Sequence, residues 1–138
     1  MQDEGFTSSD PGFVDSLDTP ESYRNKAALF TELWDWITDD IRRTNILKGF
    51  RRSGVERNQG ELIALMHSEL SEALDALRNN NPPSDHVPEI SGAEEEFADI
   101  LIRLMDMADA KKFNIPKALF LKMQFNKNRP HMHGGKLF

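Results

Sequence analysis

The segment AEEEFADILIRLMDMA, residues 93 to 108, decides the class of fold. Its apolar side chains recur every three or four residues and cover more than half of a helix's circumference, which predicts a helix with a large buried face. The centre of that face comprises Phe97, Ile100, Leu101, Leu104 and Ala108, and Ala98, Ile102 and Met105 widen it. A narrow polar strip remains, made of Glu95, Glu96, Asp99, Arg103 and Asp106. We therefore expect a deeply buried helix with charged side chains along one edge.

The segment HSELSEALDALR, residues 67 to 78, combines apolar spacing and acidic side chains in the same way. Leu70, Leu74 and Leu77 have the spacing of a buried helical face. The face also includes Ile63 and Met66, and Leu62, Ala73 and Ala76 extend it to one side. Glu69 falls among these last three, and Glu72 lies at the outer edge of the face. An ionised carboxylate is costly to remove from water unless something pairs with it, so both acids require a partner.

Helix caps and helix breakers divide the chain into four predicted helices. Thr19, Pro20 and Glu21 mark the first start, with Thr as the N-cap, Pro in the first turn and an acid near the positive end of the helix. The segment NNNPPSDHVPEISG, residues 79 to 92, ends the second helix. The predicted helices run from about 20 to 44, 60 to 79, 93 to 112, and 116 to a point before Pro130. Because no segment alternates as a strand would, the expected fold class is all-α, a small four-helix bundle.

The composition limits the classes of function. The formal net charge of −6 argues against general affinity for nucleic acid or for an anionic membrane. The absence of cysteine excludes disulfides, thiolate catalysis and cysteine metal ligands. The acidic start lacks the apolar run of a signal peptide, and no segment reaches the ~18 apolar residues of a membrane span. We expect a cytoplasmic protein with a mobile acidic arm at residues 1 to 18 and one domain at residues 19 to 138.

Two pairs of acids have the same spacing on neighbouring predicted helices. Glu69 and Glu72 form the first pair, and Glu96 and Asp99 form the second. Residues at i and i+3 share a helical face, so adjacent antiparallel helices would bring four carboxylates within a few ångströms. Like charges that close raise one another's pKa, and a divalent cation removes the repulsion. Ligation by oxygen alone suits Mg²⁺ or Mn²⁺, so the pattern predicts a site for one of these ions.

Two alternatives compete with this interpretation. Arg103 could pair with Glu96 or Asp99 on its own helix, which would make the charged strip structural and the protein a non-catalytic helical interaction module. A di-iron carboxylate bundle would require Glu-x-x-His on its helices. The chain contains no Glu-x-x-His, so this second alternative ranks last.

Two segments resemble a known enzyme family. Glu69-x-x-Glu72, followed after 23 residues by Glu96-x-x-Asp99, resembles the signature of the all-α nucleotide pyrophosphohydrolases. That group includes MazG-like enzymes, dimeric dUTPases, dCTP pyrophosphatases and phosphoribosyl-ATP pyrophosphohydrolases. The segment KMQFNKNRPHMHGGKLF, at the end of the chain, resembles the MazG-like ending, although its HMHGG leaves open whether His131 or His133 is the counterpart.

The resemblance, which covers roughly residues 30 to 138, implies an activity and a set of site residues. The implied activity is Mg²⁺-dependent hydrolysis of a (deoxy)nucleoside triphosphate to the monophosphate and pyrophosphate, in house-cleaning of the nucleotide pool by a homo-oligomeric MazG-like bundle. The implied metal ligands are Glu69, Glu72, Glu96 and Asp99, and either Glu69 or Glu72 orients or deprotonates the attacking water. The implied phosphate contacts are Lys122, Asn126, Arg129 and Lys136.

Aromatic side chains are the candidates for contact with a nucleobase. Trp34, Trp36 and Phe50 could each stack on a base. Trp36 falls on the apolar stripe of the first helix, so we expect it in the core. Trp34 lies off the centre of that stripe and is the better candidate for a pocket or a subunit interface. The preferred base and sugar, the number of ions, and the choice between dimer and tetramer stay open.

Overall fold

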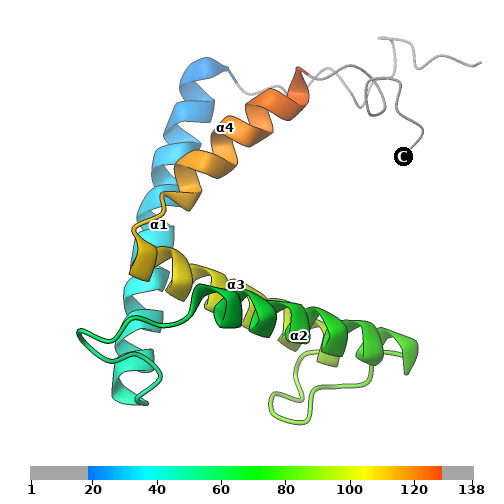
Figure 1. Cartoon of the computed structure of the whole chain (residues 1–138). Helices are drawn as coiled ribbons and strands as arrows, with labels where there is room; N and C mark the ends of the chain where they lie inside the picture. The colour runs from blue at the N-terminus through cyan, green and yellow to red at the C-terminus, as the bar shows by residue number, and fades with distance from the viewer. Residues whose placement is uncertain (1–18, 129–138) are drawn as a thin grey trace, which may run out of the picture.

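The computed structural model describes residues 19–128, and this part of the chain is all-helical, as predicted. Its four helices are α1 (Pro20–Leu47), α2 (Gln59–Arg78), α3 (Gly92–Lys111) and α4 (Ile115–Lys127). Helices α2 and α3 lie side by side as a hairpin, α1 crosses the open end of that hairpin, and α4 folds back along α1 (Figure 1). The predicted arm at residues 1 to 18 lies outside the described residues.

The helices begin where their capping residues predict. The hydroxyl of Thr19 accepts a hydrogen bond from the Ser22 N–H at 3.1 Å, and Pro20 occupies the first turn of α1. At the start of α3, Ser91 and Glu94 form a capping box in which each side chain accepts a hydrogen bond from the other residue's backbone N–H. These local interactions satisfy backbone donors that a helix leaves unpaired, so the starts need no tertiary contact to define them.

Small residues allow α2 and α3 to approach closely. A Cβ added to Gly92 would lie 3.3 Å from the Cβ of Ala76, and Ala73 and Ala93 are buried in the same interface. The turn between the helices is held by Asn81, which adopts a positive φ of 48° and whose side chain accepts a hydrogen bond from the Ala93 N–H. The end of α2 therefore meets the start of α3, and the two helices run antiparallel.

Aromatic rings join α4 to the first half of α1. The ring of Phe120 packs edge-on against Tyr23, with 5.5 Å between centroids, and against Phe30, with 5.6 Å. The Tyr23 hydroxyl also donates a 3.4 Å hydrogen bond to the Phe120 carbonyl. This contact holds α4 on α1, at a distance from the middle of the α2–α3 hairpin (Figure 1).

Ion pairs connect α3 to the segment between α1 and α2. Arg57 lies 2.6 Å from the buried carboxylate of Asp106, and Arg51 lies 2.6 Å from Asp109 and 3.5 Å from Asp106. Burial raises the pKa of Asp109, but the hydrogen bond and charge of Arg51, with the charge of Arg42, hold it below its usual value. The two aspartates thus fix the connecting segment against the C-terminal half of α3.

The expectation that the widest apolar faces are buried is wrong for a single chain. Leu70, Leu74 and Leu77 of α2 are exposed, and so are Phe97 and Leu101 of α3. Helix α2 meets α3 through its alanines, and no other described element covers the leucine side. In one chain α3 packs on both α2 and α1, and α1 also packs on α4, so the four helices do not form a bundle closed around one core.

The same correction applies to Trp36. This side chain is 70% exposed rather than in the core, because α4 packs on a different side of α1.

In the described part of the chain, no helix has both the length and the hydrophobicity needed to cross a membrane.

Candidate metal site

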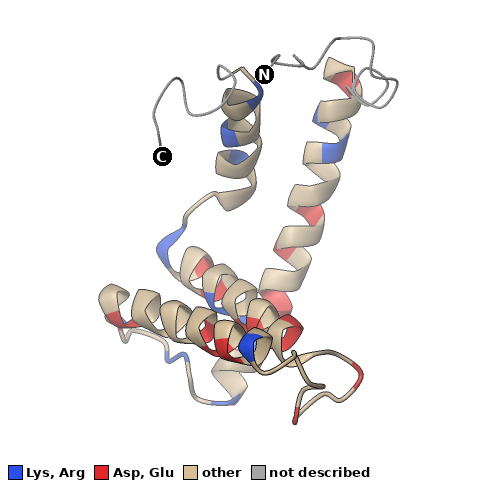
Figure 2. Ribbon diagram, turned by 90° about the vertical axis from the view of Figure 1, so that its right-hand side faces the viewer, with Lys and Arg blue, Asp and Glu red and all other residues tan. Residues whose placement is uncertain are grey.

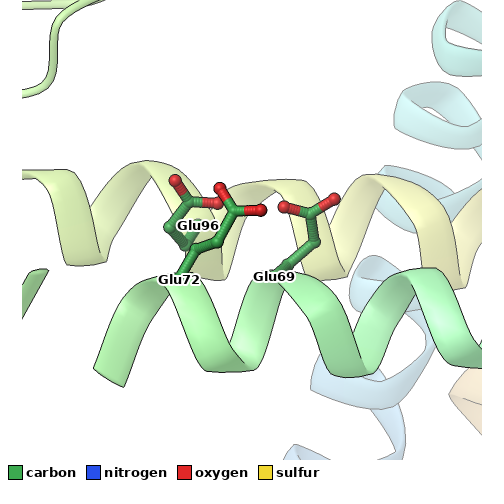
Figure 3. A group of neighbouring side chains, drawn as sticks. All are labelled: Glu69, Glu72 and Glu96. Carbon is green, nitrogen blue, oxygen red and sulfur yellow. The ribbon is translucent and has the colours of Figure 1, made fainter. Parts of the chain in front are cut away.

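Three of the four predicted metal ligands converge. Glu69 and Glu72 from α2 and Glu96 from α3 each offer a carboxylate oxygen, and these oxygens lie within 4.8 Å of one another. Figure 3 shows the three side chains rising to the same side, between the facing helices. Glu69 is buried, Glu96 half-buried and Glu72 exposed, so an ion would reach the group from solvent. This geometry and an all-oxygen donor set fit a hard divalent cation such as Mg²⁺ or Mn²⁺.

The carboxylates are crowded enough to disfavour full ionisation. Burial raises the pKa of Glu96 to about 7, helped by a hydrogen bond with Glu69 and by the negative charges of Glu72, Glu69 and Asp99. Burial also raises the pKa of Asp99, with the charge of Glu69 as the next cause. The group therefore carries an excess of negative charge that a cation would neutralise.

Asp99 lies beside this group rather than in it. It follows Glu96 by one turn of α3, and the effect of Glu69 on its pKa places it within electrostatic range of the cluster. Among the described residues, the carboxylates that meet within 4.8 Å are the other three. Asp99 could act as a fourth ligand only if the ion lay closer to Asp99 than to the centre of the three glutamates, or if Asp99 bound a second ion.

Arg103 supplies a cation at the edge of the cluster. Its Nε donates to Glu69 Oε1 at 2.7 Å, and its Nη2 lies 2.6 Å from the same oxygen. The predicted partners were Glu96 and Asp99 on the same helix, whereas the ion pair crosses the interface between α3 and α2. This partner was not predictable from spacing along one helix, because it depends on the register of the two helices.

A pocket of about 570 Å³ adjoins the cluster. Asp99 and Arg103 line it together with Asp106 and Ile102 of α3, Glu61, Leu62 and Leu65 of α2, Asn45 of α1, and Phe50, Glu56, Arg57 and Asn58 of the connecting segment. This volume lies in the range of small-ligand sites. Sequence reasoning missed the pocket, with the exception of Phe50 as a stacking candidate, because an irregular connection forms much of its wall.

The two predicted phosphate contacts that the structure describes, Lys122 and Asn126, do not lie at the cluster within one chain. Lys122 and Asn126 are exposed on α4, and the Lys122 ammonium lies over the ring of Phe125, 4.5 Å from its centroid. Acidic residues are frequent along the α2–α3 hairpin, whereas α4 carries Lys residues and no acidic residue (Figure 2). Arg129, Lys136 and both candidate histidines lie outside the described residues.

Trp34 also lies away from the cluster. Its half-buried ring sits 5.9 Å from the ring of Phe30 and lines a separate cavity of about 280 Å³ with Thr38 and Asp109. It takes no part in the pocket that adjoins the carboxylates. The aromatic side chain that does line that pocket is Phe50.

Comparison of the chain with protein-family models, with curated proteins and with solved structures finds no match.

Proposed function

We propose that the protein is a divalent-metal-dependent nucleotide pyrophosphohydrolase of the MazG-like type. The reaction converts a (deoxy)nucleoside triphosphate and water to the monophosphate and pyrophosphate. The observation that supports it is the meeting of Glu69, Glu72 and Glu96 within 4.8 Å across two helices, beside a pocket large enough for a nucleoside. The test is pyrophosphate release from a panel of ribo- and deoxyribonucleoside triphosphates with Mg²⁺, and no turnover of any of them would contradict the proposal.

In this mechanism the carboxylates hold the ion and handle the proton. Glu69, Glu72 and Glu96 would hold Mg²⁺ or Mn²⁺, and the bound ion would supply positive charge for the phosphates and make the attacking water more acidic. Glu69 or Glu72 orients the water and accepts its proton. The water oxygen forms a bond to the phosphorus of either the α- or the β-phosphate, and the bond from that phosphorus to the oxygen that bridges the two phosphates breaks. The bridging oxygen leaves with the other phosphate.

The adjoining pocket would receive the nucleoside. Phe50, Leu65 and Ile102 offer apolar surface for a base, and the side chains of Asn45 and Asn58 line the same space. Because Asp99 belongs both to this wall and to the surroundings of the cluster, a triphosphate extending from the pocket would reach the carboxylates. Phe50 therefore replaces Trp34 as the proposed stacking residue.

We further propose that the working form is a homo-oligomer. Leucines of α2 and apolar residues of α3 are exposed in a single chain, where contact with water is unfavourable, and a second copy could cover them. A second copy could also bring Lys122 and Asn126 of its own α4 to the cluster that they do not reach within one chain.

Charging the leucine face should break the oligomer. We expect sedimentation equilibrium to show a dimer or tetramer for the natural protein and a monomer for the double variant Leu74→Asp, Leu101→Asp, because a buried aspartate without a partner is costly. Val87→Asp, in the connection between α2 and α3, should leave the mass unchanged. A natural protein that sediments as a monomer would contradict this proposal.

Glu96→Gln should stabilise the metal-free protein and remove its response to Mg²⁺. The pKa of Glu96 is raised from 4.5 to about 7 in the folded state, so the folded protein holds a proton that the unfolded chain releases. That contribution to stability is complete below about pH 4.5 and is lost as the pH rises through 7. Glutamine mimics the protonated form, so at pH 8 without metal we expect a gain of about 1 kcal/mol in the free energy of unfolding.

Urea unfolding at pH 6 and pH 8, with and without Mg²⁺, measures these effects at one fixed protein concentration. The natural protein should gain stability from Mg²⁺ at pH 8 and less at pH 6, because protons compete with the ion. Glu32→Gln, on the exposed surface of α1, is the matched control and should change neither value. Equal Mg²⁺ stabilisation of the natural protein and of Glu96→Gln would exclude Glu96 as a ligand.

One observation favours a non-catalytic helical interaction module instead. The ion pair between Arg103 and Glu69 already partners the most buried of the three carboxylates, as a purely structural strip would require. In that case Mg²⁺ should change neither stability nor oligomeric state, and carboxylate variants should be tolerated. Stabilisation by the metal therefore separates the two functions.

A further inference from the structure

We propose that Arg103 is a substrate-binding residue with two alternative partners: Glu69 in the metal-free protein, and the triphosphate of the substrate once an ion has bound to Glu69. This inference rests on the proposed function and adds a residue to it. In the metal-free protein, the positive charge of Arg103 would balance Glu69 in place of the ion. In the metal-bound protein, the guanidinium of Arg103 would bind the polyphosphate in the pocket.

The first support is the pairing itself. Both Nε and Nη2 of Arg103 converge on one oxygen of Glu69, at 2.7 and 2.6 Å. The Glu69 side chain is only 9% exposed, so its charge needs a partner at all times. A divalent ion among the three glutamates would supply that partner, and it would place a second positive charge close to the guanidinium. The ion and Arg103 therefore compete for Glu69.

The second support is the freedom of Arg103 to leave. Its side chain is 39% exposed, whereas Arg57, the other arginine in the pocket, is 21% exposed and lies 2.6 Å from the buried Asp106. Because Arg57 is committed to that carboxylate, Arg103 is the arginine that can turn without leaving a deeply buried acid unpaired, provided that an ion replaces it on Glu69.

The third support is the position of Arg103 between two sites. It touches Glu69 of the cluster and lines the 570 Å³ pocket, so a short rotation of its side chain directs the guanidinium from one to the other. A guanidinium binds phosphate oxygens through two parallel hydrogen bonds, which suits a triphosphate whose other end is held by the ion. The lysines of α4 do not supply this contact within one chain.

The test measures metal binding and nucleotide binding separately. Calorimetric titration with Mn²⁺ alone should give an affinity about tenfold higher for Arg103→Gln than for the natural protein, because the competing charge is gone. Titration with a non-hydrolysable triphosphate analogue at saturating Mn²⁺ should give an affinity about tenfold lower for the same variant, because the phosphate contact is gone. A merely structural ion pair would not move these two affinities in opposite directions.

Two further variants complete the design. Arg103→Lys keeps the charge and loses the two-pronged geometry, so its Mn²⁺ affinity should stay near the natural value while its affinity for the analogue falls. Arg78→Gln, in the exposed last turn of α2, removes an equal charge away from the cluster and should change neither affinity. Arg103→Lys also preserves the test if Arg103→Gln does not fold.

The possible results separate this inference from the proposed function. Weaker Mn²⁺ binding by Arg103→Gln would mean that Arg103 supports Glu69 as a ligand, and unchanged Mn²⁺ binding would mean that the ion pair is structural. Either result would overturn the proposal that Arg103 exchanges Glu69 for the triphosphate. If the natural protein binds Mn²⁺ and the analogue but hydrolyses no triphosphate, the proposed function fails and the two affinities still decide the exchange. If it binds no Mn²⁺, both proposals fail.

Discussion

Glu69→Gln should lower the rate of pyrophosphate release by about 10²- to 10⁴-fold, the range that a positioned acid or base contributes. The reason is that Glu69 is the buried member of the cluster and meets both Glu72 and Glu96 within 4.8 Å. Glutamine keeps the size of the side chain but loses the charge that holds a cation and the oxygen that accepts a proton. The loss should appear for every triphosphate that the natural protein hydrolyses, since Glu69 itself does not line the pocket and touches it only through Arg103.

The rate is best measured with inorganic pyrophosphatase as the coupling enzyme, over a range of Mg²⁺ concentrations. Asp75→Asn is the matched control, because it removes one carboxylate from the exposed side of the same helix and should retain activity. Far-UV circular dichroism should show equal helical content for all three proteins. Turnover by Glu69→Gln at the natural rate would remove Glu69 from the mechanism.

Asp106→Asn should lower the free energy of unfolding by about 3 kcal/mol, the largest effect on stability that we expect from one substitution. Asp106 is buried, lies 2.6 Å from Arg57 and contacts Arg51 at 3.5 Å. Removing its charge leaves Arg57 mostly buried without an anion, while Arg51 keeps Asp109. The connecting segment should loosen from α3, and because that segment and Asp106 itself line the pocket, affinity for a nucleotide analogue should also fall.

Urea unfolding at a fixed protein concentration would measure this loss. Asp39→Asn is the control: Asp39 is only partly buried and pairs with Arg42 and Arg43 of its own helix, and such partly exposed pairs contribute about 1 kcal/mol or less, while Arg42 keeps its contact with Asp109. Losses of similar size in the two variants would show that the buried network has no special role in stability.

The helices could be predicted closely because their ends are determined locally. The hydroxyls of Thr19 and Ser91 cap helix starts by accepting hydrogen bonds from backbone N–H groups only three residues later in the chain. The asparagines and prolines of residues 79 to 92 exclude a continuous helix, whatever the tertiary structure. The spacing of the acids likewise predicted that Glu69, Glu72 and Glu96 would meet, because both pairs border the face on which α2 and α3 touch.

The packing was less predictable because it depends on long-range choices. Periodicity identifies the widest apolar face, here Leu70, Leu74 and Leu77, but the two helices meet through alanines, where their backbones can come closest. The partner of Arg103 depends on the register of two helices, which no spacing within one helix contains. The position of α4 depends on aromatic contacts to Tyr23 and Phe30, residues almost a hundred positions earlier in the chain.

The small residues between α2 and α3 have a consequence for how such a protein can diverge. Gly92 against Ala76 allows the two backbones to approach closely at the end of the hairpin where α2 meets α3, and a larger side chain at Gly92 would push them apart. In the proposed oligomer, substitutions among the outward leucines would change how strongly copies associate without acting on the contact between α2 and α3. If the proposed function holds, ion binding should therefore tolerate changes among the outward leucines better than changes at Gly92 or Ala76.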